Sequence, residues 1–542
     1  MTNFKDKVIY QIYTKSFRDS NGDGLGDIQG VIEKLDYLKE LGVDYIWMTP
    51  FFQSPLNDNG YDISDYRTID PVFGTMEDVE ELIAQAERRG MSLMFDMVFN
   101  HTSTEHEWFQ RALAGEKKYQ DYYIFRDGTP DAPPTNWESK FGGNAWAYVP
   151  ELGKWYLHLY DRTQADLNWD NPEVREELKD VLRFWKAKGV KGFRFDVINV
   201  ISKPTIFQDD NQGDGRRFYT DGPRVHEYLK ELVADAGIGG MVTVGEMSST
   251  SLDNCIRYTN PAEKELSMTF SFHHLKVDYK NGNKWELQPP DLAKLKELLT
   301  LWQIEMQKAN GWNAVFWCNH DQPRVVSRFG DDQRYWKESA KMLATCIHLL
   351  RGTPYIFQGE ELGMTNAGYT SIDQYRDVES LNYYRIMLQS GKTETEALEI
   401  LRQRSRDNGR TPMQWDSSVN AGFTKGIPWI MPPENFRHIN IQAERSDPDS
   451  ILHYYKKLIQ LRKQEPVISE GQIAFLYQDV PGVFAYRRFH QGQDLFVVNN
   501  LTGYDIALNN MPWTGFQKIL GNYTDDSTIL RPYESAVYGP CK

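Results

Sequence analysis

The chain has 542 residues, of which 40% are apolar and 25% charged, so it can bury a large core in more than one domain. Its formal net charge of −15 argues against nucleic acid as a partner, because a phosphate backbone requires a basic face. The start, MTNFKDKVIYQIY, lacks the apolar core of a signal peptide and no later run could span a bilayer, so we expect a cytoplasmic monomer without a membrane partner.

Strand-like runs alternate with amphipathic helical runs along most of the chain. The expected strands begin near residues 7, 43, 92, 190, 241, 266, 313 and 353. A helical pattern follows each strand, from IQGVIEKLDYLKELG after the first to SILHYYKKLIQLRKQEP after the last, although the pattern near 251–257 is weak. Eight such pairs in alternation predict an α/β fold, a (β/α)8 TIM barrel.

Two connections are too long to be simple loops. Residues 100–167 are rich in Gly, Pro and aromatics, and we expect an inserted domain over the barrel mouth, between barrel segments 1–99 and 168–466. Residues 364–449 should add a helical insertion to the second of these segments. From 467 to 542 the alternation of GVFAYRRF and DLFVVNNL predicts an antiparallel C-terminal β domain.

The expected carboxyl ends of four strands are unusually acidic. They carry Asp96, Arg194 with Asp196, Glu246, and His320 with Asp321. A structural ion pair would explain one buried carboxylate as well as catalysis would. Four carboxylates around one rim repel each other, however, and cost stability unless chemistry uses them. Because catalytic groups of TIM barrels lie at the carboxyl ends of the strands, we interpret them as one active site.

Asp196 and Glu246 end neighbouring strands of the expected barrel. They therefore fit the roughly 5 to 5.5 Å that separates the nucleophile and the acid/base of a retaining glycosidase. Arg194, two residues before Asp196 on the same strand face, should keep that carboxylate ionised. The apolar run before Glu246 should raise the pKa of its carboxyl, as a general acid requires. The pattern predicts hydrolysis through a covalent glycosyl-enzyme intermediate.

Four segments in order resemble the sequence regions that identify the α-amylase family of glycoside hydrolases (family 13): DMVFNH, GFRFDV, VGEM and CNHD. The resemblance covers the whole chain. It implies that Asp196 is the nucleophile, Glu246 the acid/base, and Asp321 a third carboxylate that stabilises the transition state. It also implies that three further side chains bind the sugar in the cleavage subsite: His101, Arg194 and His320.

The α-glucosidase branch of this family is a closer resemblance. GYD at 60–62 and RDNGRTPMQW resemble segments that in this branch supply an Asp–Arg pair at the pocket floor, which would make the enzyme exo-acting. Asp62 and Arg410 would form that pair, beside Tyr61. Gln164 in QADLNW and Val197 are similar to the oligo-1,6-glucosidase group and point away from starch. The resemblance implies that Gln164 and Tyr61 also bind the sugar.

The stretches GDGRRFYTDGPR and ELSMTFSFHHLKVDY resemble the members of this group that hydrolyse trehalose 6-phosphate. In FHHLKVDY, neutral His273 stands where isomaltose-cleaving relatives usually carry an acid, and Lys276 adds a positive charge. Lys276 and Lys284 are therefore the expected phosphate ligands. Arg216, Arg217 and Arg324 are further cationic candidates. The resemblance implies a small phosphorylated disaccharide as substrate, with glucose and glucose 6-phosphate as products.

Two alternatives stay open. The first is the same chemistry on neutral isomalto-oligosaccharides, as in an oligo-1,6-glucosidase or dextran glucosidase; sucrose isomerases share the motifs as well. The second is a catalytically silent binding protein, such as the heavy chain of an amino-acid transporter. That class needs a transmembrane helix and tends to lose the catalytic carboxylates, whereas this sequence keeps them.

Residues 19–27, DSNGDGLGD, place oxygen ligands at alternate positions around glycines, as a hard cation requires. The expected ligands are Asp19, Asn21, Asp23, the Leu25 carbonyl and Asp27. Gly30 stands where an EF-hand has its bidentate Glu, so the loop is not an EF-hand. We expect a structural calcium ion, with magnesium as the alternative and no organic cofactor. Scattered cysteines without CxxC spacing favour free thiols over zinc or disulfides: Cys255, Cys318, Cys346 and Cys541.

Overall fold

The centre of the computed structural model, which describes residues 3–525 and 527–540, is a barrel of eight parallel strands. The strand order is β13-β12-β11-β5-β2-β1-β15-β14, and a parallel bridge between Thr269 and Asn313 joins the two ends of the sheet. The strands are β1 (Ile9–Ile12), β2 (Tyr45–Met48), β5 (Ser92–Val98), β11 (Gly192–Asp196), β12 (Val242–Met247), β13 (Met268–Ser271), β14 (Ala314–Val315) and β15 (Thr353–Phe357). The predicted TIM barrel is confirmed.

Helices follow every barrel strand, as the alternation predicted. They are α1 (Ile28–Glu33) with α2 (Leu35–Leu41), α3 (Met76–Arg88), α6 (Pro172–Ala187), α8 (Val225–Asp235), α9 (Leu252–Thr259), α10 (Leu292–Lys308), α11 (Val325–Phe329) with α12 (Trp336–His348), and α17 (Ile451–Gln464). Local sequence sets their ends. In α6, Asn171 accepts the first free backbone N–H, Pro172 occupies the first turn, and Gly189 leaves the helix at a φ of 106°.

The segment after β5 forms two small antiparallel sheets. β6 (His101–Ser103) pairs with β10 (Gln164–Asp166), which sets Asp166 opposite His101. β7 (Phe125–Asp127), β9 (Lys154–Leu157) and β8 (Trp146–Val149) form the other sheet, beside α4 (Glu107–Leu113) and α5 (Lys117–Gln120). The pairing of β6 with β10 brings both ends of this segment back to the barrel mouth.

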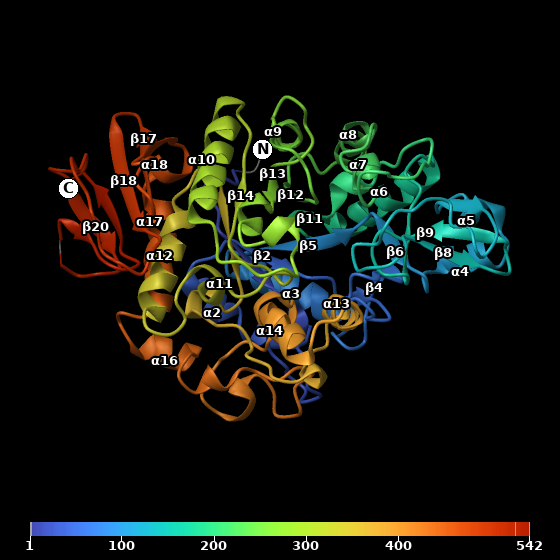
Figure 1. Ribbon diagram of the computed structural model, residues 1–542, viewed down its shortest axis with the longest axis horizontal. Helices are drawn as coiled ribbons and strands as arrows, with labels where there is room; N and C mark the ends of the chain where they lie inside the picture. The colour runs from blue at the N-terminus through green and yellow to red at the C-terminus, as the bar shows by residue number, and fades with distance from the viewer. Residues whose placement is uncertain (1–2, 526, 541–542) are drawn as a thin grey trace.

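Two further additions surround the barrel. The connection after β15 contains α13 (Val378–Gln389), α14 (Glu394–Arg404), α15 (Asp407–Arg410) and α16 (Ile441–Ser446). The C-terminal antiparallel sheet consists of β16 (Gln472–Leu476), β17 (Val483–His490), β18 (Gln493–Asn500), β22 (Ser535–Gly539) and β20 (Gln517–Gly521). Figure 1 shows this sheet beside α12 and α17, at the opposite end of the molecule from β8 and β9. The Tyr486 hydroxyl ties it to α12 by donating to the Cys346 carbonyl (3.1 Å).

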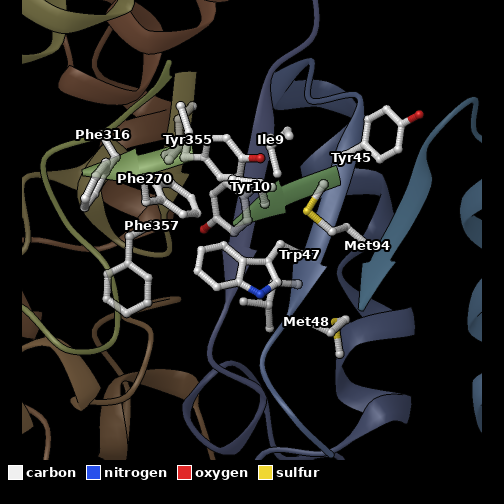
Figure 2. Packing of buried hydrophobic residues seen from close by; sticks show 14 of the residues in the cluster. Ile9, Tyr10, Tyr45, Trp47, Met48, Met94, Phe270, Phe316, Tyr355 and Phe357 are labelled. Carbon is white, nitrogen blue, oxygen red and sulfur yellow. The ribbon is translucent and has the colours of Figure 1, made fainter. Parts of the chain in front are cut away.

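Aromatic side chains fill the barrel interior beneath its mouth (Figure 2). Phe270 lies edge-on to Tyr355 and Phe316, with ring centroids 4.6 and 4.9 Å apart, and Trp47 lies 5.6 Å from Phe270. These rings come from strands on different sides of the barrel, so they hold it together through offset and edge contacts. Trp47 also donates its indole N–H to Asp96 (3.1 Å), which connects this core to the polar groups above it.

Cys255, Cys318 and Cys346 are buried and unpaired, as expected, and Cys541 lies outside the described residues. In the ranges 3–525 and 527–540, no helix is both long and apolar enough to cross a lipid bilayer.

Candidate active site

The strand register brings the predicted catalytic residues to one rim of the barrel. β11 lies between β5 and β12, with Arg194 opposite Asp96 and Phe195 opposite Gly245. Asp196 and Glu246 are the next residues along these two neighbouring strands. Directly after Asp196 the chain turns through Val197 at a φ of 37°, a region that β-branched residues rarely adopt. This local strain at the end of β11 redirects the backbone just beyond the carboxylate.

One buried guanidinium connects three of the carboxylates. Arg194 donates to Asp96 and Asp196 at 2.6 Å each, and it also contacts Glu246. The predicted Arg194–Asp196 pair is therefore present. The purely apolar setting expected for Glu246 is wrong, because a cation touches its carboxylate. Two carboxylates that share one guanidinium lie only a few Å apart, as a retaining glycosidase requires.

Asp96 lies beneath the rim with no exposed side-chain surface. Its carboxylate accepts hydrogen bonds from the Tyr61 hydroxyl (2.9 Å) and the Trp47 indole as well as from Arg194. Burial raises the pKa of Asp96 to about 7, against the lowering influence of Arg194. Because no substrate can reach Asp96, it acts on the site by fixing Arg194 and Tyr61.

Asp321 follows β14 and is held by three cationic or polar neighbours. Its carboxylate accepts from Arg410 (2.8 Å) and Arg406 (3.2 Å) and lies 3.1 Å from His320 Nε2. Burial alone would raise the pKa of Asp321, but these three groups outweigh it and hold the pKa well below the ordinary value. The His320 ring is stacked on Tyr61 (5.1 Å, 3°). The predicted residues after β14 thus form one side of the pocket.

The expected pair of Asp62 with Arg410 does not exist. Asp62 is fully buried, and its carboxylate accepts the backbone N–H groups of Asn57 and Asp58 and the Ser54 hydroxyl. Asp62 therefore stabilises the loop that contains it and has no acceptor directed at Arg410. Arg410 is also fully buried, and it contacts Asp321 instead.

The ion pair between these two segments is formed by Asp58 and Arg406 (3.1 Å). Arg406 also binds Asp377 at the start of α13 (2.6 Å). The sequence analysis missed all three residues. The loop NDNGYD contains two aspartates and the segment SRDNGRTPMQW contains two arginines, and spacing alone does not decide which aspartate faces which arginine.

His101 and Gln164 meet at the wall that the inserted segment adds. Gln164 donates to Asp58 (3.1 Å) and to the Tyr61 carbonyl (3.2 Å), and its amide nitrogen lies 3.2 Å from His101 Nε2. Both predicted sugar-binding residues thus lie beside Tyr61. Burial lowers the pKa of His101, which favours the neutral ring.

The two predicted phosphate ligands have different surroundings. Lys276 ends the 3-10 turn His273–Lys276, and its exposed side chain makes no ion pair with any described residue. Lys284 donates to Glu379 (2.6 Å), so its charge is already neutralised. His273 packs against the Trp302 ring (4.9 Å), and burial lowers its pKa to about 4. Of the two lysines predicted to bind the phosphate, only Lys276 is therefore without an acidic partner among the described residues.

Of the other cationic candidates, only Arg216 is near Lys276. Partial desolvation by the surrounding protein and the Arg216 guanidinium lower the pKa of Lys276. The same two causes, with Lys276 as a further contributor, lower the pKa of Lys140 to about 8, against the opposing effect of Asp214. Arg324 is buried and donates to the Gln358 carbonyl (2.6 Å). Lys140, which the sequence analysis missed, comes from the inserted segment.

The loop 19–27 is folded around its own carboxylates. Asp19 accepts the N–H groups of Asn21 (3.0 Å) and Gly22 (2.6 Å), and Asp27 accepts those of Ser20 and Gly30. No three His, Cys, Asp or Glu side chains of the described residues form a metal centre. Asp19 and Asp27 are nevertheless buried next to each other, without a cationic partner in the described chain. Burial and the neighbouring Asp19 raise the pKa of Asp27.

The three predicted catalytic carboxylates combine burial with access. The side chains of Asp196, Glu246 and Asp321 keep 11%, 12% and 27% of their surface exposed. At this rim two carboxylates lie beside the Arg194 guanidinium, and Arg406 connects the third, Asp321, to Asp58. This geometry permits attack by one carboxylate and proton donation by the other.

Comparison with known proteins gives the family. The family model described as the catalytic domain of alpha amylase matches residues 11–471, so the chain belongs to the α-amylase family of glycoside hydrolases. A trehalose-6-phosphate hydrolase from Bacillus subtilis is 52% identical over 99% of this chain and 98% of its own length. An oligo-1,6-glucosidase from Parageobacillus thermoglucosidasius is 46% identical, with the same coverage. A crystal structure of Bacillus licheniformis trehalose-6-phosphate hydrolase has a TM-score of 0.94 at 54% identity, covering 99% of both chains.

The pairing of Asp58 with Arg406 gives a direct prediction. We expect Asp58→Asn to lower kcat/KM for an aryl α-glucoside roughly tenfold to hundredfold, the loss typical of one charge-assisted hydrogen bond. Asp62→Asn should instead lower the melting temperature, because it removes acceptors from a buried loop. Steady-state kinetics and thermal denaturation of both variants check this, and the assignment is wrong if Asp62→Asn impairs kcat/KM more than Asp58→Asn does.

Proposed function

We propose that this chain is a retaining, exo-acting α-glucosidase that hydrolyses trehalose 6-phosphate to glucose and glucose 6-phosphate. The observation that carries the mechanism is the sharing of Arg194 by Asp196 and Glu246 at the ends of adjacent strands. The substrate assignment is supported by full-length similarity to trehalose-6-phosphate hydrolases.

The chemistry follows from the placement of the three accessible carboxylates. An Asp196 oxygen attacks the anomeric carbon while Glu246, in its protonated form, gives its proton to the departing glycosidic oxygen, and glucose 6-phosphate leaves. Glu246 then removes a proton from water, whose oxygen displaces Asp196 and releases glucose. Asp321, held ionised by Arg406 and Arg410, stabilises the positive charge that develops on the sugar ring.

The closed floor accounts for exo action. Asp58 and Arg406 together offer an acceptor and donors to the outer hydroxyls of a single terminal glucose. A longer chain could not pass this pair, because Asp377 and Asp321 hold Arg406 in place from the other side. The scissile bond is therefore always the first one from the non-reducing end.

Lys276 is our proposed phosphate ligand, with Lys140 and Arg216 as its neighbours. Desolvation is the largest cause that lowers the pKa values of Lys140 and Lys276, and the Arg216 guanidinium lowers both further; Lys276 adds to the lowering at Lys140. No described acid forms an ion pair with Lys276. A dianionic phosphate placed among these groups would relieve the repulsion through charge-assisted hydrogen bonds. Lys284 would contribute only after leaving Glu379.

The competing function is hydrolysis of neutral isomalto-oligosaccharides, favoured by the 46% identity to an oligo-1,6-glucosidase. Glucose release from trehalose 6-phosphate, trehalose and isomaltose at equal concentration distinguishes the two. We expect the phosphorylated sugar to be preferred, and preference for isomaltose would refute the substrate assignment while leaving the mechanism intact. The cytoplasmic location and the monomeric state stay predictions from the sequence.

We also propose that the loop 19–27 binds a structural calcium ion, with magnesium as the alternative. The donor set is all oxygen: Asp19, Asn21, Asp23, the Leu25 carbonyl and Asp27. Two adjacent buried carboxylates without a cationic side chain provide the charge such an ion neutralises. The ion would hold the loop after β1 rather than take part in the reaction.

Replacement of the two central carboxylates tests the mechanism. Asp196→Ala and Glu246→Gln should each lower kcat by several orders of magnitude, because each removes a group that makes or breaks a bond. Far-ultraviolet circular dichroism should match the parent, since neither side chain belongs to the barrel core. Near-normal turnover in either folded variant would refute the assigned role.

Lys276 should act on the phosphate alone. We expect Lys276→Ala to raise KM for trehalose 6-phosphate roughly tenfold to hundredfold, the worth of one charge-assisted contact, and to leave a neutral aryl α-glucoside almost unaffected. Lys280→Ala, an exposed lysine of the same loop, is the matched control and should change neither value. Equal effects of Lys276→Ala on both substrates would exclude a phosphate role.

Metal removal tests the loop. A chelator should lower the melting temperature by several degrees, and added calcium should restore it, because an ion that binds only the folded state stabilises it by mass action. Asp23→Ala should reduce this calcium effect yet match the parent in chelator, since the exposed Asp23 side chain accepts only one loop N–H. A melting temperature that the chelator does not change would contradict the proposal.

A further inference from the structure

Lys203 is a buried cation close to the sugar site that the reaction itself does not use. It follows the 3-10 turn Ile198–Val200 after β11, and its side chain is only 5% exposed. Its ammonium group donates to the Asn100 side-chain oxygen (2.6 Å) and the Val200 carbonyl (2.7 Å), and it pairs with Asp166 (2.7 Å). Three acceptors match the three N–H donors, so the position of Lys203 is fully determined.

This contact fixes the orientation of the Asn100 amide. An ammonium group can only donate, so Asn100 must turn its oxygen toward Lys203 and its nitrogen away. The Asn100 nitrogen then lies 3.1 Å from Asp166 and 3.2 Å from His101 Nδ1. A donor that faces Nδ1 requires a lone pair there, which leaves the imidazole proton on Nε2.

The other side of the ring agrees with this assignment. His101 Nε2 lies 3.2 Å from the Tyr61 carbonyl oxygen, which can only accept a hydrogen bond. Gln164 also approaches Nε2, but its amide N–H groups have acceptors of their own in Asp58 and the Tyr61 carbonyl. Both ring nitrogens therefore specify the same neutral tautomer.

The charged groups around His101 come from three elements. Asp166 lies on β10, Asp196 ends β11, and Lys203 follows that strand. Burial lowers the pKa of His101, the two carboxylates oppose this, and Lys203 lowers it further. A neutral ring leaves the charge of Asp196 undiminished, whereas an imidazolium beside it would weaken the nucleophile.

We propose that Lys203 is a positioning residue which, through Asn100, holds His101 as the neutral tautomer protonated on Nε2. The kinetic part of this inference rests on the proposed glycosidase function, but the tautomer does not. Lys203 acts on the sugar site without touching the substrate, and it ties β10 of the inserted segment to the end of β11.

The unmodified protein gives the first test, independent of activity. In a two-dimensional ¹H–¹⁵N spectrum of the side chains of ¹⁵N-histidine-labelled protein near neutral pH, His101, identified by its loss in His101→Gln, should show the Nε2-protonated neutral pattern. A pattern with the proton on Nδ1, or on both nitrogens, would overturn the proposal.

The second test is Lys203→Met. Removing the cation frees the Asn100 amide and leaves Asp166 unpaired, so the pKa of His101 should rise. The acid limb of kcat/KM against pH should move to higher pH, and kcat/KM at neutral pH should fall roughly tenfold to hundredfold. The His101 spectrum should lose the single Nε2-protonated pattern.

Lys179→Met is the matched control, because Lys179 is equally buried and binds Glu176, Glu231 and Asp235 away from the site. It should lower the melting temperature without moving the pH profile. If a folded Lys203→Met variant behaves like this control, with the profile and the His101 spectrum of the parent, Lys203 is only structural and the proposal fails. The activity of the parent protein separates this proposal from the proposed function. If the parent does not hydrolyse any α-glucoside, the proposed function fails. If the parent is active and only Lys203→Met loses activity, the proposed function stands.

Discussion

The neutralisation of crowded carboxylates by three buried guanidinium groups is the constraint on which this site depends. Arg194 holds Asp96, Asp196 and Glu246, while Arg406 and Arg410 hold the opposite side of the pocket. Like charges this close would otherwise raise each other's pKa values and destabilise the fold. Because an arginine stays charged and presents several fixed donors, it can bind more than one carboxylate at a defined spacing. The spacing required for the chemistry and the charge balance required for folding therefore have the same origin.

The barrel and its central residues could be predicted because they depend on local patterns. A strand with an acid at its carboxyl end places that acid at the rim of the barrel. The register of adjacent strands then determines which acids lie next to each other. Asp196, Glu246 and Arg194 were found in this way, and the Arg194–Asp196 pair lies within a single strand. The electrostatic environment of Glu246 could not be predicted in this way. Arg194 contacts Glu246 from the neighbouring strand, and the sequence around Glu246 contains no signal for that contact.

The pocket floor could not be predicted because it depends on how two loops meet. Asp58 and Arg406 come from distant segments, each with a second acid or base nearby that could equally have formed the contact. What decides between them is the internal bonding of each loop, where Asp62 binds its own backbone and Arg410 turns to Asp321. Likewise Lys284 looks like a free cation in the sequence, but α13 supplies Glu379 beside it. Charges on insertions can be assigned only when their partners are known.

The position of β1 in the barrel has a consequence for how the chain is made. β1 pairs with β2 on one side and with β15 on the other, where Ile9 lies opposite Tyr355. During synthesis the second partner is translated long after the first, so the growing polypeptide carries an unpaired strand edge until the barrel can close. Such edges are templates for aggregation, and pairing between distant segments is slow. We therefore expect nascent chains of this protein to depend on the ribosome surface or on chaperones, and fragments that end before β15 to be poorly tolerated by the cell.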